Sequence, residues 1–379
     1  SSGAVYVFKR TGSTWANEAY IKAPNADVND GFGVSAGIDG DTIVVGSNGE
    51  DSTQTTITNG TLIQASDSSI NDIGAAYVFK RSGNTWSNEA YLKAPNIDSG
   101  DSFGYSVSIS GDTIVVGAYG EDSNQTTITN GTLSSSNNLA SASGAAYVFR
   151  RSGTTWTNEA YLKAPNAGGG DQFGASVFID SDTIVVGSPQ ESSNQTTITN
   201  GTTASSNNSL GNCGAAYVFR RNGSTWSSEA YIKAPNAETG EFFGNSVSIS
   251  GDTILVGAFN EDSNQTSITN GTTASSDNST GNSGAAYVFR RNGSIWSSEA
   301  YLKAPNPDTG DIFGQKGISI SGDTIVVGAS QEDSNQTTIT NGSTASSINI
   351  PDTTNGNHGA VYVFKRYGTI WTNEAYLKA

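Results

Sequence analysis

Residues 101–117 read DSFGYSVSISGDTIVVG, and this stretch decides the fold class. From Phe103 to Ile109, apolar residues alternate with small or polar ones, the period-2 pattern of a strand with one buried face. Ser110-Gly111-Asp112 has the composition of a tight turn. The β-branched run from Thr113 to Gly117 then predicts a strand that is buried on both faces. The stretch therefore predicts an antiparallel hairpin.

Two more strands are predicted after a long polar insert, residues 121–143, which is rich in Ser, Asn and Thr. Residues 145–150 predict a third strand, Ser152-Gly153 a turn, and residues 156–164 a fourth strand that ends at Pro165-Asn166. No stretch keeps a 3.6-residue apolar period, so we expect very little helix. Four short antiparallel strands are the outline of a β-propeller blade.

This unit recurs along the chain with a nearly fixed period. The glycine that opens each Tyr-Val-Phe segment returns after 71, 70, 70, 70 and 75 residues, and all six tryptophans keep the same steps. The glycines are Gly3, Gly74, Gly144, Gly214, Gly284 and Gly359; the tryptophans are Trp15, Trp86, Trp156, Trp226, Trp296 and Trp371. One four-stranded unit cannot cover both of its faces, so neighbouring units must bury the Ile, Val, Phe and Tyr side chains between them.

The predicted fold class is therefore all-β: a β-propeller of four-stranded antiparallel blades, with five full repeats plus an extra N-terminal hairpin. The predicted half repeat is 1–25, and the full repeats are 26–96, 97–166, 167–236, 237–306 and 307–379, all in one propeller-like body. The Phe-Gly half occurs five times and the Tyr-Val-Phe half six times, so the strands do not divide evenly into blades. The chain is a fragment of a longer propeller, which we favour, or five closed blades with a spare hairpin, or a hairpin that completes a sheet in a neighbouring molecule.

Composition excludes several classes of function. The net charge of −16 gives no basic footprint for nucleic acid. No apolar run is long enough to predict a membrane span. Cys213 is the only cysteine, so the fold does not depend on internal disulfides, and in a variable loop it is better explained as a chance residue than as a reactive thiol. The chain opens with Ser1-Ser2-Gly3, as a processed or excised segment does.

The segments 101–107 and 112–118 resemble the FG-GAP repeat of integrin α-subunit propellers, and are most similar to its bacterial integrin-like version. Phe-Gly recurs at Phe32, Phe103, Phe173, Phe243 and Phe313, and the Val-Gly element at Gly46, Gly117, Gly187, Gly257 and Gly328. The resemblance implies a β-propeller, usually seven-bladed, displayed outside the cell for adhesion or assembly and without catalytic activity. Many integrin repeats carry a calcium loop between the first two strands. Here that connection is only Ser110-Gly111-Asp112, so the integrin calcium site cannot be carried over.

A different pair of acidic positions is the candidate metal site. One carboxylate precedes each Phe-Gly, and an acidic group opens each polar insert. Carboxylates and loop carbonyls are the hard oxygen ligands that Ca²⁺ prefers, so the two positions are candidates to share a cation; turn capping is the alternative, and we favour it. The candidate ligands are Asp101, Glu121, Asp122, Asp171, Glu191, Glu241, Glu261, Asp262, Asp311, Glu332 and Asp333.

Charged and aromatic residues also recur on the outer strands. The basic pairs Arg150-Arg151 and Arg220-Arg221 stand across a predicted hairpin from Glu159 and Glu229, which predicts cross-strand ion pairs. The repeated tryptophans are either packed over the hairpin, which we favour, or platforms for sugar stacking. Catalysis finds little support, because His358 is the only histidine and every notable acidic residue recurs in most units.

The expected function is a non-catalytic extracellular or cell-surface module with a structural or adhesive role. Expected partners are a second copy, bound through the terminal hairpin, or a surface protein. The alternative from another class is a multivalent glycan-binding propeller with several equivalent sites. An enzyme such as a glycosidase is a third and weaker alternative.

Overall fold

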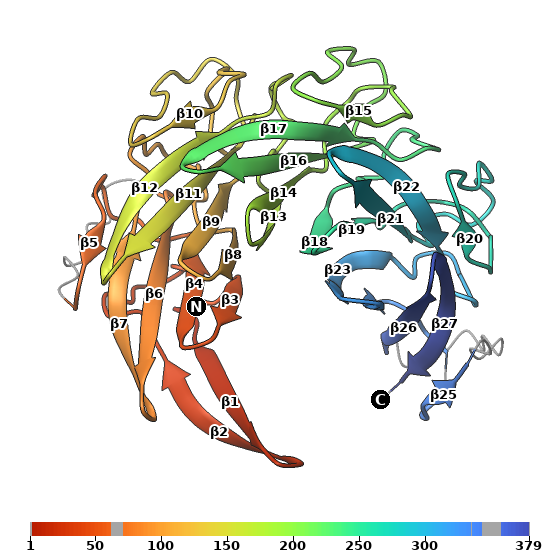
Figure 1. Ribbon diagram of the computed structural model, residues 1–379, viewed down its shortest axis with the longest axis horizontal. Helices are drawn as coiled ribbons and strands as arrows, with labels where there is room; N and C mark the ends of the chain where they lie inside the picture. The colour runs from red at the N-terminus through yellow and green to blue at the C-terminus, as the bar shows by residue number, and fades with distance from the viewer. Residues whose placement is uncertain (1, 62–70, 335, 343–357, 379) are drawn as a thin grey trace. The chain divides into compact units, whose positions relative to one another are not determined.

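A computed structural model describes residues 2–61, 71–334, 336–342 and 358–378, and the strands within these ranges are joined by turns and loops without any helix (Figure 1). The strands form a two-stranded hairpin and five five-stranded antiparallel sheets, which we call the N-terminal hairpin and the first to fifth blades. The all-β prediction of repeated blades is confirmed. The count of four strands per blade was one short, because the polar insert adds a fifth.

The strand bounds repeat from blade to blade. The N-terminal hairpin is β1 (Val5–Thr11) and β2 (Thr14–Ile21); the first blade is β3 (Ala36–Asp39), β4 (Thr42–Ser47), β5 (Thr58–Asn59), β6 (Ala75–Ser82) and β7 (Thr85–Leu92). The second blade is β8 (Ser106–Ser110), β9 (Thr113–Ala118), β10 (Thr129–Asn130), β11 (Ala145–Ser152) and β12 (Thr155–Leu162). The third blade is β13 (Ser176–Asp180), β14 (Thr183–Ser188), β15 (Thr199–Asn200), β16 (Ala215–Asn222) and β17 (Thr225–Ile232). The fourth blade is β18 (Ser246–Ser250), β19 (Thr253–Ala258), β20 (Thr269–Asn270), β21 (Ala285–Asn292) and β22 (Ile295–Leu302). The fifth blade is β23 (Phe313–Ser321), β24 (Thr324–Ala329), β25 (Thr340–Asn341), β26 (Ala360–Tyr367) and β27 (Ile370–Leu377).

All five blades share one strand order, illustrated by β8-β9-β11-β12-β10 in the second. The second strand in this order, β9, is buried along its whole length, as its β-branched run predicts. Strand β8 begins three residues later than the alternating pattern indicated, because Gly104 has a φ of +90° and turns the chain. Phe103 instead forms an isolated parallel bridge to Gly74 of the preceding repeat.

The chain divides into two compact units, Ser1–Ile184 with Arg221–Ser227, and Val185–Arg220 with Ser228–Ala379, and each is considered by itself. In the first unit, one apolar cluster joins the first and second blades: Val78 and Leu92 of one pack with Phe103, Tyr147 and Trp156 of the other. In the second unit, the fourth and fifth blades share a cluster of the same kind. The core thus lies between neighbouring blades, as the repeat predicted.

Candidate functional site

The polar insert is tied to the blades by two sets of contacts. In the second blade, Gln125 Nε2 donates to the Thr127 carbonyl and to Thr129 Oγ1, at 2.6 and 2.9 Å, which shapes the turn that precedes β10. The Asn130 side chain then reaches the next tryptophan: its Oδ1 accepts the Trp226 N–H at 2.7 Å and its Nδ2 donates to the Trp226 carbonyl at 3.2 Å. The insert therefore joins one blade to the following one.

The glutamate that opens the insert lies in a buried ion pair. Lys163 Nζ lies 2.9 Å from Glu121 Oε2, and both side chains are almost completely buried. Tyr161 OH and Asn96 Nδ2 donate to Glu121 Oε1 at 2.8 and 3.1 Å, and the Ser123 N–H donates to Oε2 at 3.2 Å. Four donors therefore surround this carboxylate, as a buried charge requires.

The lysine is equally well partnered. Lys163 Nζ also donates to Ser143 Oγ and to the Gly144 carbonyl, at 2.8 and 2.6 Å. Burial lowers the pKa of Lys163, and this effect outweighs the opposite effect of Glu121. The network continues to Tyr147, whose OH donates to Asn96 Oδ1 at 2.7 Å.

Asp101, the other predicted ligand in this repeat, caps a turn. Its Oδ2 accepts the Asp98 N–H at 2.9 Å. Burial, with a smaller contribution from Glu121, Asp98 and Asp122, raises the pKa of Asp101 to about 8. Asp101 Oδ1 is buried and has no hydrogen-bond partner within the described residues. The Glu121 carboxylate thus lies close enough to Asp101 to contribute to this raised pKa.

The equivalent residues repeat these two roles. Before Phe-Gly, one carboxylate oxygen of Asp171, Glu241 and Asp311 accepts the N–H of Gly168, Glu238 and Asp308, at 2.7, 3.0 and 2.9 Å. At the start of the insert, Glu191 and Glu261 pair with Lys233 and Lys303 at 2.7 and 2.8 Å, and Glu332 pairs with Lys378. Asp122 and Asp262 accept the N–H of Ala142 and Asn282, at 2.7 and 2.6 Å, and Asp333 occupies the equivalent position after β24.

These contacts bear on the calcium hypothesis. Within the described ranges, no three His, Cys, Asp or Glu side chains are arranged to hold a metal ion. The predicted ligands instead serve turns and ion pairs. Calcium binding stays a prediction, and calorimetry on chelator-stripped protein decides it: no heat and no rise in Tm would remove it.

Neither the lysine nor the asparagine of this network was predicted from the sequence as part of a site. Lys93, Lys163, Lys233 and Lys303 follow a buried Tyr-Leu or Tyr-Ile, and a lysine recurring beside a buried strand end is a signal for a buried acidic partner. Asn166, the equivalent of Asn96 in the next repeat, was predicted only to end a strand. The Asn96 side chain in fact links Tyr147 to Glu121.

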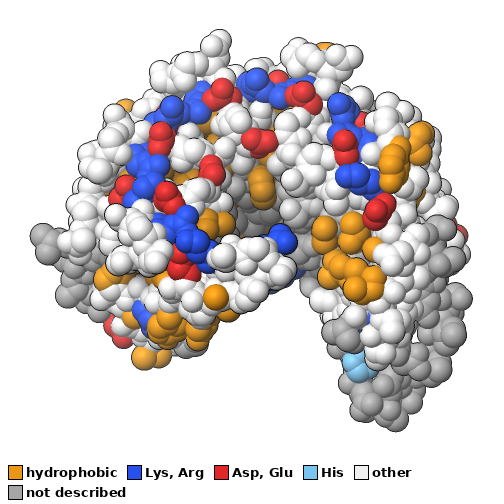
Figure 2. Space-filling view, turned by 60° about the horizontal axis from the view of Figure 1, so that its bottom comes forward, with side chains coloured by type: hydrophobic (Ala, Val, Ile, Leu, Met, Phe, Trp, Pro, Cys, Tyr) orange, Lys and Arg blue, Asp and Glu red, His pale blue; other side chains and the backbone are white. Residues whose placement is uncertain are grey.

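The arginine–glutamate pairs were predicted within hairpins, and the closest ones form between blades instead. Arg151 Nη1 lies 3.1 Å from Glu89 of the preceding repeat, and its Nη2 lies 2.7 Å from Asp112. The Trp156 indole N–H donates to the same Glu89 at 3.2 Å, and the Arg151 guanidinium lies over the Trp156 ring. Within a hairpin, Arg290 Nε lies 3.7 Å from Glu299 Oε2, a longer contact. Figure 2 shows basic and acidic side chains next to one another on this surface.

The tryptophans of the second to fifth blades are only 1% exposed, so packing, and not sugar stacking, is their role. Cys213 is also buried, and it occupies the place of Ser143 in the lysine network, with Sγ 3.0 Å from Lys233 Nζ. Burial raises the pKa of its thiol.

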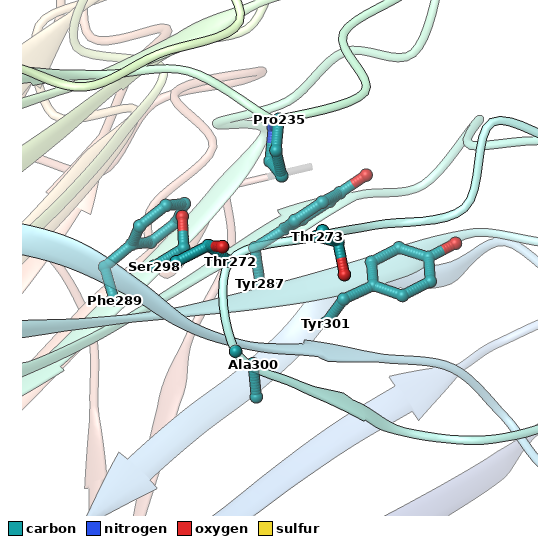
Figure 3. A pocket seen from close by; sticks show the side chains of 9 residues that line it. Pro235, Thr272, Thr273, Tyr287, Phe289, Ser298, Ala300 and Tyr301 are labelled. Atoms are coloured by element: carbon teal, nitrogen blue, oxygen red, sulfur yellow. The ribbon is translucent and has the colours of Figure 1, made fainter.

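A pocket in the second unit has apolar walls. It lies among Tyr287, Phe289, Ala300 and Tyr301 of the fourth blade, Thr272 and Thr273 of its insert, and Pro235, which follows β17 (Figure 3). It leaves essentially no room for a water molecule, so it is a packing gap and not a ligand site.

Comparison with known proteins agrees with this arrangement. The profile of the FG-GAP repeat family matches residues 15–79, 86–149, 156–219, 226–289 and 296–344, which together make up most of the chain. Comparison with curated protein sequences gave no match. Among the described residues, no helix has the length and hydropathy to cross a membrane.

Proposed function

The chain belongs to the FG-GAP repeat family, and from this premise we propose that it is a non-catalytic structural or adhesive module that works outside the cell. The family profile fits a β-propeller-like module built of repeated blades. One observation carries the proposal: the charged and aromatic side chains that recur in the blades form bonds within or between blades. Glu121, Lys163 and Tyr161 form a saturated buried network, and Arg151, Trp156 and Glu89 join two blades.

The same observation argues against an enzyme. A catalytic site needs a group with unusual surroundings that is open to substrate. In this chain the carboxyl groups with strongly raised pKa values, such as Asp101 and Glu241, are buried and recur as equivalents in other repeats. The long polar inserts remain as the surface for contacts with partners.

A multivalent lectin is the second candidate, supported by an open groove in the fourth blade. Asn270, Arg290, Arg291, Ser297 and Glu299 line this groove, and such polar groups can bind sugar hydroxyls. The tryptophans of the second to fifth blades are buried, so a sugar in this groove would bind without the stacking that such sites commonly use.

The test combines a glycan array with particle adhesion. Labelled chain is applied to the array, and particles coated with the chain are offered to one another and to protein-coated surfaces. A structural or adhesive module gives adhesion without a glycan signal. Saturable glycan binding that is inhibited by free sugar would support the lectin and contradict the structural or adhesive module. Turnover of a glycoside, ester or phosphate substrate panel would contradict both.

A further inference from the structure

The N-terminal hairpin exposes a set of aromatic residues that the other repeats bury. Tyr6, Phe8, Trp15 and Tyr20 are 56–65% exposed. Their equivalents in the second blade, Tyr147, Phe149, Trp156 and Tyr161, are at most 1% exposed. We call these four residues of β1 and β2 the hairpin face; Figure 2 shows hydrophobic side chains reaching the surface in this region. Four exposed aromatic rings on one hairpin indicate an interface.

The opposite end of the repeat array has a matching surface. Val326, Val361, Val363 and Leu377 of the fifth blade are only partly buried, and Glu374 is exposed. The equivalent apolar residues of the fourth blade, Leu255, Ala286, Val288 and Leu302, are completely buried under the fifth blade. We call the five residues of β24, β26 and β27 the fifth-blade face.

In both units, surfaces equivalent to these two pack against each other. Within the second unit, Trp371 and Tyr376 of the fifth blade pack on Val288 and Leu302 of the fourth. Glu299 receives the Arg366 guanidinium at 3.1 Å and the Trp371 indole N–H at 2.7 Å. Asn270 of the fourth insert also belongs to this junction: its Oδ1 accepts the backbone N–H of Trp371.

The same polar groups lie on or beside the hairpin face and the fifth-blade face. Arg10 and Trp15 stand where Arg366 and Trp371 stand, and Glu374 and Asn341 stand where Glu299 and Asn270 stand. No acidic side chain from another repeat meets Arg10 or Trp15 within the described ranges. The charges are complementary, because a basic residue on one face corresponds to an acidic residue on the other.

A hairpin without inner strands can pack on a blade, and this chain contains an example. On its other side, the N-terminal hairpin packs Val7 and Ile21 against Tyr77 and Phe79 of the first blade. There Arg81 Nη1 lies 3.3 Å from Glu18 Oε1, and the Trp86 indole N–H donates to Glu18 Oε2, also at 3.3 Å. Two strands therefore suffice to form this type of junction.

We propose that the hairpin face of one copy of this chain docks on the fifth-blade face of a second copy, with Arg10 and Trp15 bound to Glu374. This head-to-tail contact is heterologous, so each copy keeps one open face and association continues beyond a dimer. The proposal deepens the structural function given above and rests on it. It differs from edge-to-edge strand pairing, because sheet faces and not strand edges meet.

Sedimentation velocity of residues 1–379 over a range of concentrations tests the proposal. The mean mass rises with concentration and passes that of a dimer. Arg10→Glu and Glu374→Arg each weaken association by about tenfold or more, since each places like charges together. The double variant restores association because the ion pair is reversed. Asp277→Arg, which makes the same charge change as Glu374→Arg on an exposed insert, leaves association unchanged.

Trp15 supplies a second measurement. Acrylamide quenching of tryptophan fluorescence decreases as the wild-type chain associates, and this decrease is lost in Trp15→Phe. A chain that stays monomeric at every concentration overturns the docking and leaves the non-catalytic function intact. Association that stops at a dimer and ignores Glu374→Arg shows hairpin-to-hairpin contact and also overturns it. Substrate turnover by an associating chain contradicts the proposed function alone.

Discussion

Buried carboxyl groups with raised pKa values are the most unusual residues of this protein. Glu241 in the second unit is an example, because burial, with smaller contributions from Glu261, Glu238 and Asp262, raises its pKa to about 8. Its Oε2 accepts the Glu238 N–H, a bond that either protonation state allows. These groups stabilise turns, and they make stability depend on pH.

Glu241→Gln should increase stability at alkaline pH. The pKa of Glu241 is higher in the folded chain than its ordinary value near 4.5, so the folded state binds more protons than the unfolded state between these values. The free energy of unfolding therefore falls as pH rises from about 4.5 to about 8. Gln cannot ionise and still accepts the Glu238 N–H. Urea unfolding at several pH values should show a gain above pH 8 that disappears near pH 4. An equal effect at both ends of the range would contradict the assigned pKa.

Lys303→Met should strongly destabilise the second unit. Lys303 Nζ donates to Glu261, Ser283 and the Gly284 carbonyl, and the change leaves the Glu261 carboxylate buried without its cation. Breaking one partner of a buried ion pair typically costs about 3–5 kcal/mol. The midpoint of urea unfolding measures this loss. Adding Glu261→Gln to the same variant is the control, and it should recover part of the loss because no charge then stays unpaired.

At the scale of the strand, the glycine of the Val-Gly element sets how closely one blade approaches the next repeat. A Cβ on Gly187 of β14 would lie 1.9 Å from the Gly244 carbonyl oxygen, although Gly187 does not have a positive φ. Glycine is therefore required at this position because the next repeat lies so close, and not because of the backbone conformation. The Val-Gly element of the sequence repeat has its physical reason in this contact.

Gly187→Ala should destabilise the junction between the third and fourth repeats, since the new methyl group forces two backbones apart. Overpacking of this kind costs about 1–3 kcal/mol or more. Gly211→Ala is the matched control: a Cβ there meets no atom within 4 Å and the backbone φ is not positive. Thermal unfolding of the two variants compares them. Equal Tm values would show that the close approach does not matter to stability.

Much of this element-level structure follows from sequence, and some does not. The β-branched run of 113–117 and the alternating pattern before it predict two strands, and both exist. The fifth strand of each blade has two residues, such as Thr129–Asn130, which is too short for any periodicity to reveal. The link from Arg151 to Glu89 spans 62 residues, so only the packing of two blades specifies it. Local pattern predicts the strand, and tertiary packing decides the partner.

At the scale of the whole molecule, stability is expected to depend on contacts between nearest neighbours. The N-terminal hairpin covers Tyr77 and Phe79 of the first blade, and the first blade in turn packs on the second. In such arrays each repeat is stabilised mainly by the repeat beside it. A change that destabilises one repeat should therefore affect mainly that repeat and the one beside it.

Removing residues 1–24 should loosen the first blade alone. Hydrogen exchange measures this, because amide protection reports the local free energy of opening. Protection should fall in β6 and β7, which lose their hydrophobic cover, and should persist in β11 of the second blade. Loss of protection in β11 to the same extent would show that the first unit unfolds as one cooperative body. That result would contradict the nearest-neighbour description.

The bond between Asn130 and the main chain at Trp226 has a practical consequence. The clamp is complete by the second residue of β10, and the next residues, Thr132 and Leu133, are exposed. Closer to β11, the carbonyls of Ser141, Ala142 and Ser143 accept N–H bonds from Gly170, Gln172 and Phe173 of the next repeat. A foreign peptide inserted in the exposed stretch just after β10 would leave the bonds between blades intact. Five such positions recur at a regular period, so the protein offers a ready base for presenting several cargo sequences at once.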